Sequence, residues 1–315
     1  MSSMSSLREL GVRTALYLRY GTEPPDGGAF RSAVRRGEDG SGLVRGVLAA
    51  GEPCMVGKLG SAELGCVSFR TRWRGRWGVR LPYPRSLRRT MEVNAGVFPT
   101  DDESLDRFSD VFLEAVSQAD VLGVWLNRNE HRIVNRFCPA VQLIELEALN
   151  CVLWQDPWSA GLAGKTVLVV HPFATTIESQ YRTSRTLLFG DPKVLPEFEL
   201  KTLAAVQSGA GNECGFATWF EALERMREDI ANIEFDVAII GAGAYGLPLA
   251  AAVKEMGRQA VHLGGATQLL FGIRGRRWET ESPDDIAPLF NEHWVRPSAE
   301  ERPPNSDAVE GGCYW

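Results

Sequence analysis

Three glycines, Gly241, Gly243 and Gly246, occupy the sequence GAGAYG between a predicted strand and a predicted helix. At such a turn, backbone N–H groups and the positive end of the helix dipole can receive the phosphates of a nucleotide. A dinucleotide-binding fold would place an acidic residue on the ribose at the end of the next strand, but that strand offers His262. The turn therefore favours a nucleotide other than NAD. The alternative interpretation is that these small residues only allow the helix and the strand to pack closely.

A second group of candidate residues lies in GKLGSAEL, at the carboxyl end of a predicted strand, where open α/β sheets bind ligands. Lys58 could neutralise phosphate charge, and Glu63 could hold a cation or accept a proton. Gly60 and Ser61 lie between them and are expected to contact the same nucleotide. The structural alternative is that Ser61 caps the following helix and that Glu63 favours the first turn of that helix.

A lone histidine, His171, ends a further predicted strand, and Glu178, Arg182 and Arg185 share one face of the helix that follows. A histidine at a strand end is more often structural than catalytic. Its predicted place at the same sheet edge as Gly241 nevertheless favours contact with a ligand. We therefore predict that His171 binds the ligand rather than acting as a base, and that Glu63 and Glu178 are the candidate general bases.

Two arginine-rich runs complete the candidate residues. The run from Arg70 to Arg89 contains eight arginines and no acidic residue, and it is interleaved with aromatic side chains. Such a run can bind nucleic acid or phosphates, although a solvated face is its more ordinary interpretation. The second run, GIRGRRW, places Arg274, Arg276 and Arg277 just beyond the last predicted strand. We expect these three arginines to contact the substrate, because guanidinium groups suit phosphate oxygens.

These residues are positioned by alternating strands and helices. Apolar runs predict strands at 55–59, 121–125, 166–170, 236–240 and 259–263. Amphipathic or apolar stretches predict helices at 43–50, 62–69, 102–118, 143–149, 203–206, 216–230 and 247–256. Repeated strand-then-helix order predicts an α/β fold with a mostly parallel, Rossmann-like sheet and helices on both faces. We expect a partly mobile N-terminal arm at 1–42, a single α/β domain at 43–296 and a mobile C-terminal tail at 297–315, which is rich in Pro, Glu and Ser.

Composition narrows the class of protein. The chain has 315 residues, 44% of them hydrophobic, which is enough for a buried core. Its net charge of −6 argues against bulk attraction to nucleic acid or anionic membranes. The six cysteines form no CxxC pair, and the N-terminal stretch is broken by charges, so we expect reduced thiols in the cytoplasm. The uncharged stretch 237–253 is shorter than the roughly 20 residues of a membrane-spanning helix.

The two halves of this pattern together resemble the GT-D-fold glycosyltransferases, bacterial enzymes that use nucleotide sugars to build surface polysaccharides and glycan chains. In that family an early strand ends in an R-F-G-D-G-E-like turn, which GKLGSAEL matches at Gly60 and Glu63, with Lys58 in place of the arginine. The late segment FDVAIIGAGAYGLPLAAAVKEMGRQAVHLGG is similar to the family's late strand, Gly-containing turn, helix and strand. The resemblance spans about residues 55–265.

The resemblance implies a glycosyltransferase that moves a sugar from a nucleotide-diphosphate sugar to the hydroxyl of a glycan or other acceptor. It also implies a divalent metal, Mn²⁺ or Mg²⁺. However, Ser61 stands where the family has the first carboxylate of its D-x-E metal motif, which leaves Glu63 as the only candidate metal ligand. Either this carboxylate and the diphosphate hold the ion, or Lys58 and the arginines at 274–277 replace it.

Two functions from other classes stay open. Loss of the D-x-E pair would permit a catalytically silent nucleotide-binding or scaffold protein. The run from Arg70 to Arg89 would permit a nucleic-acid-binding module, against which the net charge argues. For the transferase we expect no stable nucleic-acid partner, and peripheral contact with a membrane is compatible with the sequence.

Overall fold

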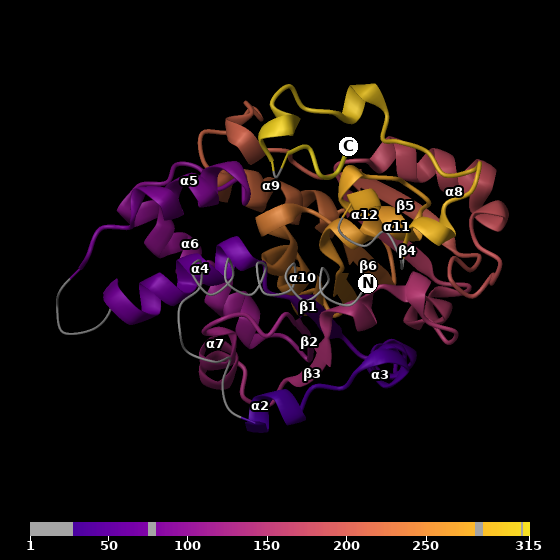
Figure 1. Cartoon of the computed structure of the whole chain (residues 1–315), viewed down its shortest axis with the longest axis horizontal. Coiled ribbons are helices and arrows are strands. Elements are labelled where there is room, and N and C mark those ends of the chain that lie inside the picture. Colours follow the sequence, from indigo (N-terminus) through magenta and orange to yellow (C-terminus); the bar gives the residue numbers. More distant parts are fainter. Residues whose placement is uncertain (1–27, 75–79, 281–285, 310) are drawn as a thin grey trace, which may run out of the picture.

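The computed structural model describes residues 28–74, 80–280, 286–309 and 311–315. Seven strands form one sheet in the order β3-β2-β1-β7-β6-β4-β5 (Figure 1). Every pairing between neighbouring strands is parallel. The strands are β1 Cys54–Lys58, β2 Val121–Val124, β3 Gln142–Glu145, β4 Thr166–His171, β5 Glu199–Ala204, β6 Val237–Ile240 and β7 Gln259–His262. The predicted α/β class with a parallel Rossmann-like sheet is therefore confirmed.

Helices cover both faces of this sheet (Figure 1). One face carries α4 Ser61–Phe69, α5 Arg85–Val93, α6 Asp102–Ser117, α7 Glu130–Phe137, α9 Trp219–Ala231 and α10 Gly246–Glu255. The other face carries α3 Gly37–Ala49, α8 Ala174–Leu188 and α11 Thr267–Leu270, with the short helix α12 Arg276–Thr280 beside α11. The short helix α2 Gly28–Ser32 lies at the edge of the molecule in the view of Figure 1. Each face has its own buried apolar cluster, as expected of a sheet covered on both sides.

The central helix α10 follows β6 directly and packs against β1, β6 and β7. Every residue from Gly246 to Val253 is buried, which explains the uncharged sequence of this helix. Gly57 of β1 permits the contact, because a Cβ at this position would lie 2.7 Å from Leu247 Cδ1. The close approach places the N-terminus of α10 beside the ends of the central strands.

Two edge strands were predicted as helices, and both predictions are wrong. Residues 143–149 form the end of β3 and a 3₁₀ turn at Leu146–Leu149, and residues 203–204 belong to β5. β5 is only partly buried, and its sequence ELKTLA lacks the continuous apolar run of the central strands. Edge strands bury less surface, so their sequences carry a weaker strand signal.

Both ends of the domain extend beyond the predicted limits. At the N-terminal side, α2 and α3 begin before residue 43, and Arg35 forms a parallel bridge with Ile144. The part of the predicted arm at 1–27 lies outside the described residues. At the C-terminal side, Glu301 accepts hydrogen bonds from the N–H groups of Thr175 and Thr176 at the start of α8, and Cys313 is buried. The prediction of a loose tail at 297–315 is therefore wrong for its described part, which packs on the domain.

Candidate functional site

A cavity of about 630 Å³ lies at the carboxyl edge of the sheet. Strands from both halves of the sheet contribute to its wall, namely Lys58 of β1, His171 of β4 and His262 of β7 at their carboxyl ends, and Gly241 just after β6. Open parallel sheets bind ligands outside the carboxyl ends of their strands, at the point where successive connections run to opposite sides of the sheet. The volume falls in the range of small-molecule and cofactor sites, roughly 300–1,000 Å³.

The structure brings most of the predicted site residues together in this one cavity. Its wall includes Lys58, Gly60, Ser61, Glu63, His171, Gly241, Gly243, His262 and Arg277. The early GKLGSAEL turn and the late GAGAYG turn therefore face a shared space, although they lie some 180 positions apart in the sequence.

The three glycines of the late turn differ in what surrounds them. Gly243 adopts a φ of +53°, lines the cavity, and has no neighbouring atom within 4 Å of the position that a Cβ would take. In contrast, a Cβ at Gly246 would lie 2.4 Å from the His262 ring, and one at Gly241 would lie 2.5 Å from the His171 ring. Close packing thus explains Gly246, which does not line the cavity, while the backbone at Gly243 is open to a ligand.

Two neutral imidazoles form part of the wall. Burial lowers the pKa of His171 to about 3, and its Nδ1 accepts a hydrogen bond of 3.0 Å from the N–H of Phe173. The proton of the neutral ring is therefore carried by Nε2, which makes His171 a hydrogen-bond donor and a very weak base. Burial, with the charge of Lys58 adding to it, lowers the pKa of His262 well below its usual range. Neither ring adds charge to the cavity at neutral pH.

Charged side chains in the described wall are few: Lys58 and Arg277 are cationic, and Glu63 is anionic. Lys58 packs against the backbone of Gly264, where a Cβ would lie 2.7 Å from its Cε. The N–H of Arg277 donates to the carbonyl of Cys313, and its guanidinium lies near the ring of Tyr314. The balance of charge favours an anionic ligand.

The carboxylate of Glu63 folds back over Gly60, since a Cβ on Gly60 would lie 2.1 Å from Glu63 Oε2. Gly60, not Ser61, is the residue that precedes α4, and it has no side chain to cap the helix. Ser61 Oγ instead accepts a hydrogen bond of 3.1 Å from Asn127 Nδ2. The prediction that Ser61 caps the helix is therefore wrong, whereas Glu63 does lie at the first turn of α4.

The donor set does not fit a metal held by the protein alone. Glu63 is the only carboxylate side chain in the described wall of the cavity. Across the part of the chain that the structure describes, no group of three or more His, Cys, Asp or Glu side chains is arranged to hold a metal ion. Mg²⁺ and Mn²⁺ prefer several oxygen ligands. We therefore assign no chemical step to a metal.

Besides Gly246, three predicted site residues do not line the cavity. Glu178 is on α8, where its carboxylate pairs with Arg182 at 2.6 Å in a half-exposed i,i+4 ion pair, so it is not placed to serve as a base. Arg274 lies over the ring of Phe290 and donates to the carbonyl of Asn291. Arg276 donates to the carbonyl of Gly311 at the surface. Only Arg277 of this run reaches the cavity, because the short helix α12 turns its neighbours elsewhere.

Sequence reasoning missed the contribution of the C-terminal segment. Tyr314 and Trp315 line the cavity, and the Trp315 ring meets Phe173 edge to face. The carbonyl of Tyr314 accepts a hydrogen bond from Gln268 Nε2 at 3.0 Å, and the main-chain oxygen of Trp315 accepts one from the N–H of Arg276 at 3.3 Å. The available signal was the apolar CYW triplet at the end of an otherwise polar segment, which is typical of a docked segment rather than a loose one.

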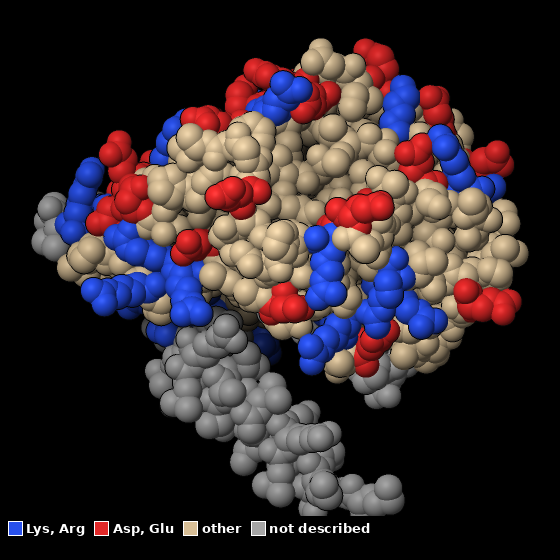
Figure 2. All heavy atoms as spheres, turned by 90° about the horizontal axis from the view of Figure 1, so that it is seen from above, with Lys and Arg blue, Asp and Glu red and all other residues tan. Residues whose placement is uncertain are grey.

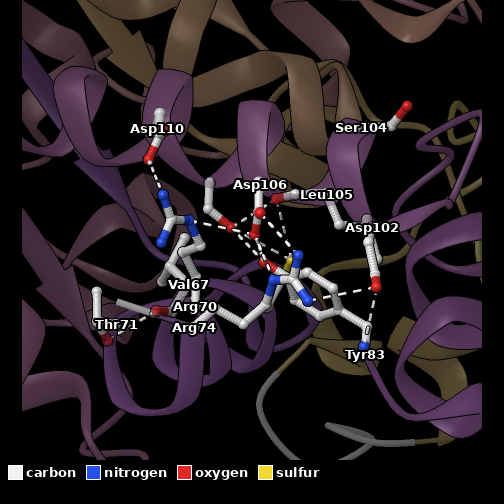
Figure 3. Close-up of polar contacts among 12 residues, drawn as sticks. Val67, Arg70, Thr71, Arg74, Tyr83, Asp102, Ser104, Leu105, Asp106 and Asp110 are labelled. Carbon is white, nitrogen blue, oxygen red and sulfur yellow. Dashed lines mark hydrogen bonds and ion pairs between the residues drawn. The ribbon is translucent and has the colours of Figure 1, made fainter. Parts of the chain in front are cut away.

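Part of the first arginine-rich run is bound to acidic residues of α6, as Figure 3 shows for Arg70 and Arg74. Arg74 Nε and Nη2 donate to the two oxygens of Asp106 at 2.7 and 2.8 Å, and Arg70 pairs with Asp106 and Asp110. Arg88 forms an ion pair with Asp102. Burial alone would raise the pKa of Asp106, but hydrogen bonds from Arg74 and Tyr83 and the nearby arginine charges lower it overall. On the face shown in Figure 2, Lys and Arg side chains gather in two groups, each with Asp and Glu side chains at its edge.

The loop that follows β2 is held by a buried carboxyl group. Glu130 is fully buried, and its two oxygens accept hydrogen bonds from the N–H groups of Trp125 and Asn127 at 3.3 and 2.9 Å. Burial, only partly opposed by these hydrogen bonds, raises the pKa of Glu130 to about 7. The same loop carries Trp125 in the cavity wall and Asn127 against Ser61. Glu130 therefore holds in place the loop that forms this part of the cavity wall.

No known protein family, no curated protein and no solved structure matches this chain. Of the helices that the structure describes, none has both the length and the apolar character needed to cross a bilayer.

Proposed function

We propose that this protein is a glycosyltransferase that binds a nucleotide-diphosphate sugar in the cavity at the carboxyl edge of the sheet and transfers the sugar to an acceptor hydroxyl. The observation that supports it most is the meeting of Lys58, Arg277 and the open backbone at Gly243 in one cavity. These groups have the chemistry to hold a diphosphate, since cationic side chains and a helix N-terminus both attract phosphate oxygens.

Aromatic residues at the C-terminal side of the same cavity suit the nucleoside. Tyr314 and Trp315 present flat rings, which favour stacking with a nucleobase. The indole Nε1 of Trp315 is buried without a hydrogen-bond partner among the described residues. A buried donor without a partner is costly, so a ligand that accepts a hydrogen bond there would be stabilised.

The proposed step forms a bond between the acceptor oxygen and C1 of the sugar and breaks the bond from C1 to the diphosphate oxygen. The electron pair of the broken bond stays on the diphosphate, where Lys58 and Arg277 offset the developing charge. The acceptor proton passes to Glu63, the only carboxylate side chain in the described wall. This role requires the Glu63 side chain to leave its position over Gly60. Neutral His171 donates a hydrogen bond and does not compete for the proton.

The state of the cysteines fits a cellular location for this activity. All six cysteines are free thiols, which fits the reducing cytoplasm where we propose that the protein acts, in the synthesis of a polysaccharide or other glycan.

A catalytically silent nucleotide-binding protein is the second candidate. The observation that favours it is the position of Glu63, whose carboxylate lies against Gly60 with no second carboxylate beside it in the described wall. Such a protein would bind the donor with the same residues and lack turnover.

Thermal-shift measurements with UDP-, GDP-, dTDP- and CMP-sugars, each with and without Mn²⁺, test the proposal on the wild type and on Glu63→Ala. A ligand at about 100 times its Kd adds roughly 2.7 kcal/mol of stability, which such a measurement detects. CMP-sugars carry one phosphate and serve as the control for the diphosphate. We expect at least one diphosphate sugar to raise the midpoint in both proteins, and transfer to offered acceptors only in the wild type. Failure of every nucleotide would refute the proposal, and binding without turnover would favour the silent protein.

A further inference from the structure

We propose that a second cavity, which adjoins the first across α4, is the acceptor site and binds a carbohydrate. This inference rests on the proposed transferase function and assigns the class of its acceptor. The second cavity has a volume of about 480 Å³. Its wall comes from α4, the turn at Arg70–Arg74 that continues α4, and the loop after β2.

The two cavities share part of their walls. Ser61, Gly65 and Leu87 line both of them. Ser61 is also joined to the β2 loop through its hydrogen bond from Asn127. Glu63, which belongs to the same turn of α4, lies on the side of the first cavity. A molecule in the second cavity can therefore extend a hydroxyl past Ser61 toward the proposed base and the bound donor.

The wall of the second cavity has the residue types that bind sugars. Trp73 is 45% exposed there, and Trp125 is 44% exposed in the adjoining wall of the first cavity. Large indole faces that remain in water favour contact with the C–H faces of pyranose rings. Asn127, Asn129 and Arg72 supply amide and guanidinium groups for hydroxyls.

The hydroxyl of Ser68 lacks a partner within the described parts of the chain. Ser68 Oγ is buried and makes no hydrogen bond there, although Ser68 lines the second cavity. A hydroxyl can both donate and accept, so a sugar hydroxyl would satisfy it. This observation is independent of the tryptophans and points to a polar occupant.

Trp73 is held on a fixed support. Arg70 and Arg74, three residues before it and one after it, are both bound to acidic residues of α6 (Figure 3). The guanidinium of Arg72 lies 5.1 Å from the centre of the Trp73 ring. Another part of the wall is the loop that carries Asn127, and buried Glu130 holds this loop in place. Both parts of the wall are thus ordered before a ligand arrives, which lowers the entropic cost of binding.

NMR titration of the whole protein with methyl glycosides of glucose, galactose, mannose, rhamnose and N-acetylglucosamine tests this assignment. We expect at least one glycoside to bind the wild type, Trp73→Ala to raise its Kd at least fivefold, and Trp73→Phe to raise it less than Trp73→Ala, because an aromatic face is retained. Leu187→Ala is the matched control, since Leu187 is 51% exposed and lines neither cavity.

The response to the nucleotide sugar in the thermal-shift measurement should be the same in all three variants, which separates this site from the donor site. No binding by any glycoside, or equal affinity of the wild type and Trp73→Ala, would overturn the inference. If glycosides bind as expected while no nucleotide does, the carbohydrate site stands and the transferase proposal fails.

Discussion

At the scale of single residues, two glycines of one motif have different roles: Gly246 allows close packing, whereas Gly243 leaves the backbone open to a ligand. We expect Gly246→Ala to lower the free energy of unfolding by about 2 kcal/mol, because the new methyl group overlaps the buried His262 ring. Gly243→Ala meets no neighbour but adopts a positive φ, so its cost is about 1 kcal/mol. Urea denaturation checks both values.

Ligand binding should rank the two variants in the reverse order: Gly243→Ala costs less stability but should lose more affinity for the nucleotide sugar. The methyl group of Gly243→Ala is added to a residue of the cavity wall and is expected to weaken binding of the nucleotide sugar, whereas folded Gly246→Ala should retain this binding. Equal binding by both variants would mean that the turn serves packing alone.

Lys58 supplies a test of charge. We expect Lys58→Ala to weaken binding of a nucleotide-diphosphate sugar about tenfold or more, because one charge-assisted hydrogen bond contributes roughly 1.5–3 kcal/mol. Lys193→Ala is the matched control, since it removes the same charge from an exposed residue outside the cavity. Isothermal titration calorimetry measures both affinities, and an equal loss in the two variants would show that only net charge matters.

Glu130 predicts a dependence of stability on pH. Its pKa is raised from an ordinary value of 4.5 to about 7 in the folded protein. The folded state therefore binds its proton more tightly, and the stabilisation is fully present below pH 4.5 and lost as the pH rises through 7. Glu130→Gln cannot ionise. We expect its unfolding free energy, relative to that of the wild type, to rise by on the order of 2 kcal/mol between pH 5 and pH 8. A constant difference would contradict the assignment.

At the scale of elements, the C-terminal segment is held in place by Glu301 at the N-terminus of α8. Removal of this carboxylate by Glu301→Ala is expected to release the segment that carries Tyr314 and Trp315, and so to weaken nucleotide binding severalfold. Hydrogen exchange should increase in the backbone of residues 299–315 while the strands stay protected. Glu300→Ala is the control, because its exposed carboxylate contacts only the nearby Ser298 in the described structure. Unchanged exchange in Glu301→Ala would refute this account.

The sequence predicted the elements that are buried on both faces. β4, β6 and β7 are short, buried and rich in β-branched or small apolar residues, and their ends were predicted to within one residue. The edge strands β3 and β5 escaped prediction, since half-exposed strands such as ELKTLA carry mixed polarity. The turns at Lys58 and Gly241 could be placed at the site because both follow central strands, whose carboxyl ends meet at one sheet edge.

Residues that enter the site from outside the sheet could not be predicted in the same way. Tyr314 and Trp315 reach the cavity through long-range contacts with Gln268 and Phe173, which no local pattern encodes. The position of Glu178 depends on the rotation of α8, which turns this side chain toward Arg182 at the surface. Arg274 and Arg276 were likewise displaced from the site by the turn that begins α12.

At the scale of the whole molecule, charge predicts that nucleic acid is not a ligand. The net charge is −6, and Arg70, Arg74 and Arg88 are bound to acidic residues of α6. We expect a labelled single-stranded oligonucleotide to bind more weakly than about 10⁻⁴ M at physiological salt. Fluorescence polarisation measures this affinity. Tight binding that falls steeply with salt would restore the arginine run as a binding surface.

The order of the strands in the sheet has a consequence for folding during synthesis on the ribosome. β6 and β7 are made late, yet they lie between β1 and β4. A nascent chain that has left the ribosome only up to residue 236 holds two sheet fragments, β1 to β3 and β4 to β5, whose inner edges have no partner strand. Unpaired edges invite association with other chains, so this interval is where chaperones would be needed. Insertion of β6, α10 and β7 closes both edges and creates the ligand cavity in the same event.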